Sequence, residues 1–514
     1  MPIENWSGGY DVGLEYVFDH HPEMDPSRVG WALWRAGLAA PEIRTACELG
    51  YGQGVGVVLH GTAGDAAWWG CDFMPGHTAG ARDLARAGGA PITLGEDSFA
   101  EFAARDDLPM FDYVALHGVW SWVSAEDRRT IVAFLRRRLV SGGVVYISYN
   151  VRAGWSQHQH LRNLLKQFVE RHTPAATPPG ERIDAALDYL ERLAPTIPAS
   201  GASSMTFAES VAHFRSMDRR YLAHELLHDE WAAFDFPDVV RDLAAAKLTY
   251  AGSADLLDTV AAIGTTPEQA DFLGRIDDPI LREATRDVMI GRRFRHDLFV
   301  RGPRVLPTSR LVEGIRDRRV ILTRPAREVF DKFSGAQGKG VLRKETYLAL
   351  VAGLGDLVAH RIGDVFDTAA APGTTLGQIF EAISVLVAMG DVALVQSDEA
   401  TQTARPRTAR LNAEIARRAR DGSEISALAS PITGGGIACD LIERLFVDAY
   451  LAGSRTSADW AEHARECLSM LGWDIGSDGD GAGGEADRLG ELRQLADRFL
   501  ADRLPQLRAL GVVD

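Results

Sequence analysis

Short apolar runs that end at a glycine or a polar residue recur through about the first 150 residues of the chain. They alternate with longer segments whose apolar residues recur at helical spacing, such as Val29 to Leu38. Short runs bounded by turn residues are typical of buried strands. The predicted strands end near Leu49, Asp72, Glu96, His117 and Asn150. Strands that alternate with helices predict a Rossmann-like α/β sheet.

The first predicted strand leads into a stretch in which glycine recurs at every second position, from Gly50 to Gly56. Glycine lets the backbone adopt positive φ and approach a ligand closely. A helix that begins near Val55 would direct its free N–H groups and its positive end at that ligand. By itself the pattern fits a nicotinamide dinucleotide, S-adenosylmethionine (SAM) or a tight strand-to-helix turn.

Acidic residues follow the next two predicted strands. Asp72 lies 18 residues after Gly54, close to the spacing at which an acid hydrogen-bonds ribose hydroxyls. Asp97, with Ser98 beside it, occupies the third loop, where a carboxylate suits an adenine amino group. These loops all follow the carboxyl ends of strands, which is where open α/β sheets bind ligands.

Four stretches carry a resemblance to a known family: E-L-G-Y-G-Q-G from Glu48, W-W-G-C-D-F-M-P from Trp68, F-D-Y-V-A-L-H-G-V-W-S-W-V from Phe111 and S-G-G-V-V-Y-I-S-Y-N-V-R-A-G-W from Ser141. Together they resemble class I SAM-dependent methyltransferases. More narrowly, the chain is similar to members with a methyltransferase regulatory domain, a group that includes bacterial lysine methyltransferases acting on outer-membrane proteins. Similar motifs follow further on: Y-L-A-H-E from Tyr221, F-R-H-D-L from Phe294 and L-A-S-P-I-T-G from Leu428.

The resemblance implies SAM as the cofactor and a set of residues that bind it. These are Tyr16, Glu48, Gly50, Gly52, Gly54, Asp72, Phe73, Asp97, Ser98 and His117. Tyr10 and Tyr16 correspond to a tyrosine-rich segment that closes over SAM in the family, although a loop packed on the domain explains residues 10–29 equally well. For His117 we favour cofactor contact over a catalytic role.

Candidate catalytic residues come from the two loops beyond the cofactor. Trp120 and Trp122 could form an aromatic cage around an ammonium group, or they could simply pack at the loop base. Tyr149 could accept a proton or orient the amine, and Asn150 lies next to it. A lysine nucleophile needs such help, because its free pKa of about 10.4 leaves little neutral amine at pH 7. Methyl transfer from a sulfonium requires alignment and desolvation but no metal.

The rest of the chain predicts further domains. β-like runs at Leu248–Ala251 and Leu298–Val300 would complete a seven-stranded methyltransferase sheet, which sets the catalytic domain at 1–303. Within it, about 173–217 forms a helical insertion that caps the site, makes a dimer contact or is a surface hairpin. A strand at 319–323, a helix at 375–389 and a strand at 392–396 predict a winged-helix-like middle domain over 304–405. A mostly helical domain would cover 406–514, with a flexible linker at 477–485.

Composition narrows the range of functions. A net charge of −16 disfavours nucleic-acid binding, and basic and acidic residues balance across the middle domain. The D/N-P-P-Y signature of nucleic-acid amino-methylating enzymes is absent after the fourth strand. The chain has no long apolar run and no signal-peptide pattern at its start, and its four cysteines are scattered, so we expect a cytoplasmic protein without disulfides or a zinc site.

Three functions remain open. The first is a SAM-dependent methyltransferase of a protein or peptide, with a lysine side chain favoured by the resemblance. The second is an O- or N-methyltransferase of a small metabolite or a peptide carboxylate, in which the C-terminal half serves dimerisation. The third is a non-catalytic SAM-binding scaffold, against which the complete glycine and acid set argues. An incubation with methyl-labelled SAM would separate the first two functions. Label in proteins would favour the first, and label in small molecules would favour the second.

Overall fold

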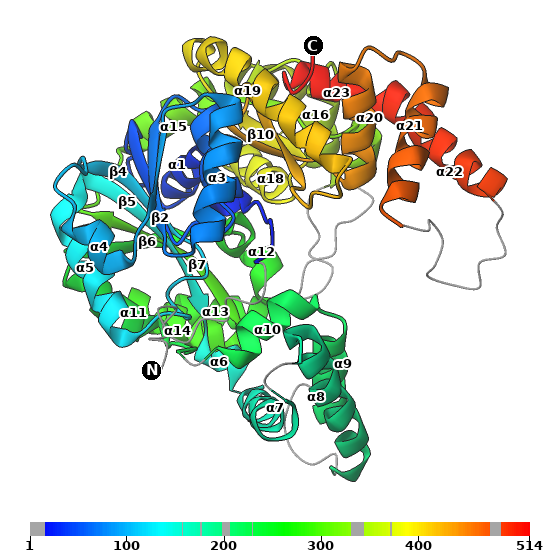
Figure 1. Cartoon of the computed structure of the whole chain (residues 1–514). Helices are drawn as coiled ribbons and strands as arrows, with labels where there is room; N and C mark the ends of the chain where they lie inside the picture. The colour runs from blue at the N-terminus through cyan, green and yellow to red at the C-terminus, as the bar shows by residue number, and fades with distance from the viewer. Residues whose placement is uncertain are drawn as a thin grey trace.

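The computed structural model describes residues 16–156, 158–174, 177–197, 206–228, 230–329, 344–370, 373–472 and 485–514. Its centre is a seven-stranded sheet in the order β3-β2-β1-β4-β5-β7-β6 (Figure 1). The strands are β1 Thr45–Leu49, β2 Ala67–Asp72, β3 Ile92–Glu96, β4 Phe111–Leu116, β5 Leu139–Asn150, β6 Leu248–Ser253 and β7 Phe294–Arg301. β1 to β5 pair in parallel, while β7 runs antiparallel to both β5 and β6. The predicted methyltransferase sheet, with its last two strands antiparallel to each other, is confirmed.

The two faces of the sheet are covered by different helices. Helices α1 Pro26–Arg35, α2 Val55–Ala63 and α3 Pro75–Gly88 pack on one face, and α4 Phe99–Ala104, α5 Ala125–Arg138 and α11 Phe236–Ala244 pack on the other. Side chains alternate between these faces along each strand. Tyr146 of β5 lies in the core beneath α1 and α2, whereas Ile147 and Tyr149 lie in the core beneath α5 and α11. This alternation decides which side chains can reach a site on either face.

A group of helices between β5 and β6 forms a body with its own core. It contains α6 Arg152–Trp155, α7 Gln159–His172, α8 Pro179–Leu193, α9 Phe207–Arg215 and α10 Arg219–Leu227. Leu165, Leu187 and Phe214 are among its buried contacts. In Figure 1 this body projects below the sheet. The predicted insertion at about 173–217 covers its middle, and α7 and α10 extend it on either side. Shorter elements lead from α11 to β7: η3 Leu256–Thr259, α12 Ala261–Gly264, α13 Pro267–Gly274 and α14 Pro279–Ile290.

The segment after β7 has the predicted winged-helix-like character. Its antiparallel strands, in the order β10-β8-β9, are β8 Arg319–Leu322, β9 His360–Arg361 and β10 Val392–Val395. The helices around them are α15 Thr308–Asp317, α16 Lys344–Gly353, α17 Ile362–Ala369 and α18 Leu376–Ala388. Trp31 of α1 donates to Ser384 Oγ of α18 at 2.9 Å, so this unit is joined to the sheet's first helix through a buried hydrogen bond.

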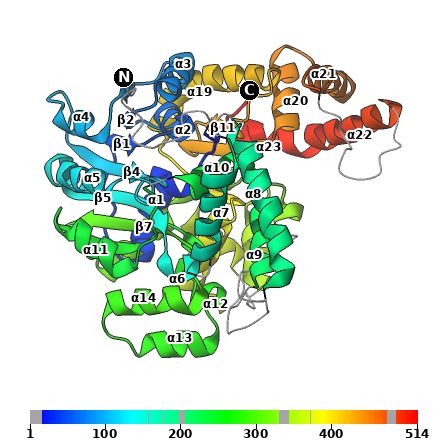
Figure 2. The same ribbon diagram turned by 60° about the horizontal axis from the view of Figure 1, so that its bottom comes forward.

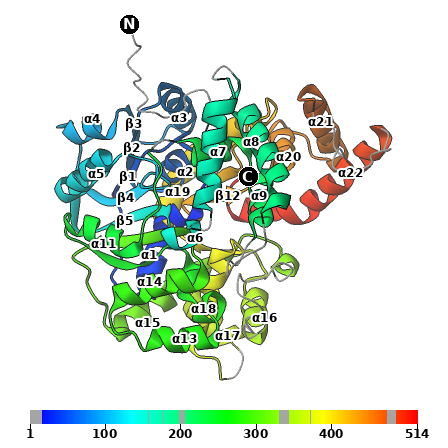
Figure 3. The same ribbon diagram turned by 90° about the horizontal axis from the view of Figure 1, so that it is seen from below.

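The C-terminal region is mostly helical, as predicted. It comprises α19 Asp398–Ala419, β11 Ala427–Ser430, β12 Gly435–Ala438, α20 Leu441–Leu451, α21 Ser457–Met470, α22 Glu485–Arg498, a π-helical turn Phe499–Arg503 and α23 Leu504–Ala509. Helix α19 and the β11–β12 hairpin pack against α2 and α3. Figures 2 and 3 show α20 to α22 extending away from the sheet. Most of the predicted linker at 477–485 lies outside the described residues. No described helix is long and apolar enough to cross a membrane.

Candidate active site

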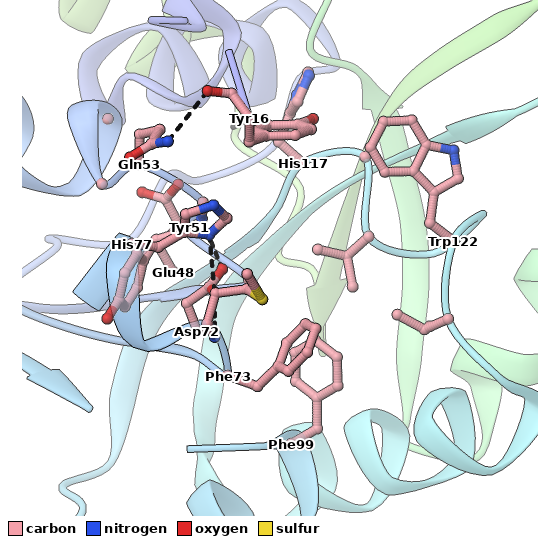
Figure 4. Close-up of a pocket in the computed structure, with 18 of the residues that line it drawn as sticks. Tyr16, Glu48, Tyr51, Gln53, Asp72, Phe73, His77, Phe99, His117 and Trp122 are labelled. Atoms are coloured by element: carbon pink, nitrogen blue, oxygen red, sulfur yellow. Dashed lines mark hydrogen bonds and ion pairs between the residues drawn. The ribbon is translucent and has the colours of Figure 1, made fainter. Parts of the chain in front are cut away.

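A cavity of about 390 Å³ opens at the carboxyl ends of β1, β2 and β4 (Figure 4). This is the edge where the strand order reverses, and its volume is in the range typical of small-molecule sites. The cavity wall includes every residue that the resemblance implied for the cofactor: Tyr16, Glu48, Gly50, Gly52, Gly54, Asp72, Phe73, Asp97, Ser98 and His117. The structure therefore brings together side chains that are up to about a hundred residues apart. Tyr10 lies outside the described residues.

The glycine-rich turn between β1 and α2 forms the floor of the cavity. Gly50, Gly52 and Gly54 all have positive φ, at 68°, 54° and 75°. A Cβ at Gly54 would lie 2.4 Å from the Cβ of Ala81 in α3, so this position needs glycine for space as well as for conformation. Gly54 caps α2 without a side-chain hydrogen bond, and the Glu48 carboxylate lies beside Gly56 in the first turn of the helix.

Asp72, at the end of β2, fixes this turn in place. Its Oδ2 accepts a hydrogen bond from the Gly52 N–H at 2.9 Å, and its Oδ1 accepts one from the Met74 N–H at 2.9 Å. His77 Nδ1 of α3 lies 3.2 Å from the same Oδ1. Oδ1 therefore has two polar neighbours, whereas Oδ2 accepts one hydrogen bond and keeps lone-pair capacity. Asp72 thus anchors the turn, and its Oδ2 can still accept a hydrogen bond from a ribose hydroxyl.

Glu48 is the least satisfied polar group in the cavity wall. It is buried, and its Oε2 has no hydrogen-bond partner. Burial, reinforced by the nearby Asp72 carboxylate, raises the pKa of Glu48 to about 8. A buried carboxyl group without a partner fits a cationic ligand, and SAM carries both an ammonium and a sulfonium. On this observation the cavity fits SAM.

Binding of the cofactor at pH 7 should therefore release about one proton. A cation beside Glu48 favours the ionised carboxylate, while the ligand-free group, with its raised pKa, is mostly protonated at that pH. Because the bound state holds one proton fewer than the free state, the affinity for S-adenosylhomocysteine (SAH) should rise with pH, by about tenfold between pH 6 and pH 7. Calorimetry of SAH binding in buffers of different ionisation enthalpy measures the released proton. Glu48→Gln should bind more weakly and release none, and proton release that persists in this variant would contradict the assignment.

The other end of the cavity wall contains two phenylalanine rings. Phe73 and Phe99 both line the cavity, and Figure 4 shows them below Asp72. Asp97 closes this end, where its Oδ2 accepts a hydrogen bond from Arg105 at 3.1 Å. Ser98 caps α4, and its side chain accepts a hydrogen bond from the Glu101 N–H. Aromatic rings and a carboxylate in the same wall suit a planar base with an amino group.

Aromatic and imidazole side chains form the remaining wall. Tyr16 and Trp122 meet edge to face with ring centroids 6.0 Å apart. His21 stacks on His117 with centroids 3.5 Å apart. Gln53 donates to the Tyr16 carbonyl at 3.2 Å, which ties the N-terminal segment to the glycine-rich turn. Of the predicted aromatic cage, Trp122 is in the cavity wall.

The structure does not place the other candidate catalytic residues at the cavity. Trp120 is fully buried in the core beneath α5 and α11. The Tyr149 hydroxyl donates to Asp297 Oδ2 at 2.6 Å on that same face, and burial raises the pKa of Tyr149 well above its ordinary value. Asn150 is buried, and its amide donates to Glu225 Oε1 at 2.7 Å. The assignments of Trp120, Tyr149 and Asn150 are therefore corrected: Tyr149 faces the other side of the sheet, Trp120 and Asn150 are buried, and none of the three lines the cavity.

Glu225 connects this wall to the helical body. Its carboxylate accepts hydrogen bonds from Trp122 Nε1 at 3.1 Å, Asn150 Nδ2 at 2.7 Å and Trp231 Nε1 at 2.8 Å. Burial raises the pKa of Glu225, and the donors around it act in the opposite direction. Glu225 thus orients Trp122 and does not face the reaction itself. The side chain of His224 is outside the described residues.

Several wall residues were not among those expected from the sequence. Tyr51 and Gln53 belong to the glycine-rich motif but were not singled out, and the others are Asp19, His21, His77, Phe99, Asp127, His228 and Glu230. His228 and Glu230 enter from the far end of the helical body, which local sequence patterns do not locate in space. Within the described part of the chain, no group of three or more His, Cys, Asp or Glu side chains is arranged to hold a metal ion. All four cysteines are free and buried.

Comparisons with known proteins find a matching family model and several similar proteins. A family model described as a predicted methyltransferase regulatory domain matches residues 218–301. The chain is 29% identical over 514 residues to protein sll1526 of Synechocystis, with 99% of both chains covered. Protein RP789 of Rickettsia prowazekii is 26% identical over 275 residues, which is 51% of this chain and 47% of that one.

Among solved structures, PKMT2 from Rickettsia typhi in complex with AdoHcy superposes with a TM-score of 0.68 at 15% identity, covering 97% of this chain and 100% of that one. The shared fold thus extends through the C-terminal half. The matched regulatory domain spans β6, β7 and Glu225, so part of it lies beside the cavity. The chain thus matches the model of a predicted methyltransferase regulatory domain over residues 218–301, and it shares the fold of PKMT2 over nearly its whole length.

Proposed function

We propose that this enzyme transfers the methyl group of SAM to the side-chain amine of a lysine in a protein substrate. The observation that carries the proposal is the combination of aromatic rings and carboxylates in the cavity wall. Tyr16 and Trp122 present ring surfaces that attract an ammonium group. Asp19, Asp127 and Glu230 line the same cavity and favour entry of a cation. An anionic acceptor such as a peptide carboxylate would meet repulsion there.

The residues of the chain act by positioning and by excluding water. SAM supplies an activated methyl on a good leaving group. Glu225 holds Trp122, and Gln53 holds the Tyr16 backbone, so the aromatic wall is preorganised before a substrate arrives. A lysine enclosed by this wall loses hydration, which lowers its pKa and raises the fraction of neutral amine. Alignment of that amine with the methyl then supplies much of the acceleration.

The size of the chain supports a macromolecular substrate. Much of it lies outside the sheet, in the helical body, the winged-helix-like unit and the C-terminal helices, and these units lie to the right of the sheet and below it in Figure 3. The net charge of −16 is compatible with a basic protein segment and disfavours nucleic acid. We further propose that the enzyme works in the cytoplasm, which suits its free buried cysteines, and that a homodimer is its assembled form.

Methyl-labelled SAM, incubated with the purified enzyme and a host lysate, tests the proposal. We expect label in gel-resolved proteins that survives base treatment, and methyl-lysine after acid hydrolysis. The Asp72→Ala variant in the same lysate controls for other methyltransferases. Base-labile label would indicate a carboxyl ester, and label confined to small molecules would indicate a metabolite substrate. Either of these results would overturn the lysine proposal.

A further inference from the structure

A buried tyrosine connects two histidines behind the aromatic wall. The Tyr146 hydroxyl lies 2.8 Å from Nδ1 of His117 and 2.8 Å from Nδ1 of His296. Tyr146 itself is fully buried, whereas both imidazoles are only partly buried. The three side chains come from β4, β5 and β7, so rigid strands set the distances. Neither Tyr146 nor His296 lines the cavity itself.

The geometry restricts where the protons are. A phenol has one hydrogen, so Tyr146 can donate to only one imidazole, and the other neutral imidazole must donate its own Nδ1–H to the phenol oxygen. When Tyr146 donates to His296, His117 carries its proton on Nδ1 and leaves Nε2 as a free acceptor. The Ser148 hydroxyl, which accepts a hydrogen bond from the Gly118 N–H at 2.8 Å, lies 3.3 Å from His117 Nδ1 and serves as a second acceptor for it.

The two ends of this chain of contacts have different surroundings. His117 lines the cavity with His21 stacked on it, while His296 is not among the cavity-lining residues. Around His296, the carboxylates of Glu23 and Asp255 are close enough to interact with it electrostatically. One end therefore touches the substrate space, and the other lies near carboxylates that can receive a proton.

We propose that His117, Tyr146 and His296 form a proton relay that removes a proton from a protonated amine substrate in the cavity. This inference rests on the proposed function and deepens it, because an amine nucleophile arrives as an ammonium and must lose a proton, whereas a carboxylate need not. His117 is the catalytic residue of the relay. Tyr146 and His296 act through it.

Each proton that moves in this step passes from one named atom of the relay to the next. The ammonium gives its proton to His117 Nε2, which leaves the amine lone pair free for the methyl. His117 passes its Nδ1 hydrogen to the phenol oxygen of Tyr146, and the phenol passes its own hydrogen to His296 Nδ1. Tyr146 stays neutral, His117 ends as the other neutral tautomer, and His296 ends as an imidazolium. That imidazolium then releases its proton toward Glu23, Asp255 or solvent.

The directions of the pKa shifts agree with this order of proton transfers. Desolvation, and then the charges of His21 and His296, lower the pKa of His117 well below its ordinary value, so it begins neutral. Burial, followed by Glu23 and Tyr113, raises the pKa of Tyr146, with Arg28 acting in the opposite direction, so the phenol keeps its hydrogen. Burial also lowers the pKa of the stacked His21.

The test compares Tyr146→Phe and His296→Gln with the wild type across pH. Single-turnover methyl transfer from labelled SAM to a pool of random peptides, each with one lysine, gives the rate. At pH 7.5 we expect each variant to be slower by roughly 100-fold, in line with the loss of general-base assistance. Near pH 10, where about a third of free lysine amine is already neutral, the defect should fall to within a few-fold. SAH affinity, measured by calorimetry, should not change.

Tyr113→Phe is the matched control, because Tyr113 is a buried tyrosine of the adjacent strand whose hydroxyl donates instead to the Met24 carbonyl at 2.8 Å. It should behave as the wild type at every pH. A defect in Tyr146→Phe and His296→Gln that is the same at pH 7.5 and pH 10, or no defect at all, overturns the relay while leaving the proposed function intact. Absence of methyl-lysine with the wild-type enzyme overturns the proposed function itself, and the relay with it.

Discussion

Replacement of Asp72 by alanine should weaken SAH binding by roughly 100-fold or more, the largest effect on cofactor affinity that we expect from one side chain. The change removes charge-assisted acceptors for the ligand, each of which contributes about 1.5–3 kcal/mol. It also removes the carboxylate that holds the Gly52 and Met74 N–H groups, so the glycine-rich turn loses its anchor. Both consequences lower affinity.

Calorimetry with SAH measures this effect, and two variants sharpen it. Asp72→Asn preserves the shape but loses the charge, so it should lie between alanine and the wild type. Asp83→Ala is the control: Asp83 lies in α3, the helix that follows β2, but it is exposed and pairs with Arg86. Unchanged SAH affinity in Asp72→Ala would contradict the assignment of this cavity to the cofactor.

Arg295→Gln should destabilise the folded protein by about 3–5 kcal/mol, the largest stability loss that we expect from one substitution. Arg295 of β7 is only 2% exposed and forms ion pairs with Asp297 at 2.8 Å, Asp287 at 2.7 Å and Glu283 at 2.8 Å. Without the guanidinium, these carboxylates keep their desolvation cost and repel one another. The junction between β7 and α14 would then open.

Thermal unfolding followed by circular dichroism, with matched denaturant series, checks this prediction. Arg310→Gln is the control, because Arg310 pairs with Glu313 on the surface, where a lost ion pair costs about 1 kcal/mol or less. Equal unfolding midpoints for the two variants would show that the buried ion pairs contribute no more to stability than the surface pair does. Arg295→Gln should also leave SAH affinity unchanged in the fraction that stays folded, because Arg295 does not line the cavity.

The cofactor half of the site could be predicted from the sequence because its determinants are local. Gly50 to Gly54 and Asp72 lie at strand ends, and parallel strands bring those ends to one edge of the sheet without further information. The catalytic role expected of Tyr149 depended on which face of β5 its side chain occupies. Tyr149 and Tyr146 are three positions apart on β5 and thus face opposite sides of the sheet. Tyr146 faces the cavity side.

The remaining wall depends on long-range register. His296 reaches Tyr146 because β7 inserts antiparallel between β5 and β6, with Ser148 opposite His296. Glu225 reaches Trp122 across 103 residues through the helical body. Neither pairing has a periodic or compositional signature, since many registers of an antiparallel strand bury equal apolar area. The fold class could be predicted from the pattern of apolar and polar residues. The contacts of His296 and Glu225 are visible only in the three-dimensional structure.

The β11–β12 hairpin leaves no room behind the N-terminal segment that carries Tyr16 and His21. A Cβ at Gly435 would lie 2.2 Å from Asp25 Oδ2, and one at Gly436 would lie 2.8 Å from the His20 ring. Gln396 and Arg407 add hydrogen bonds to the Ala63 and Gly64 carbonyls at the end of α2. If the chain were shortened to the catalytic sheet, the cavity wall would therefore lose the hairpin that packs behind its N-terminal segment. The shape of the cavity thus depends on residues from both halves of the chain.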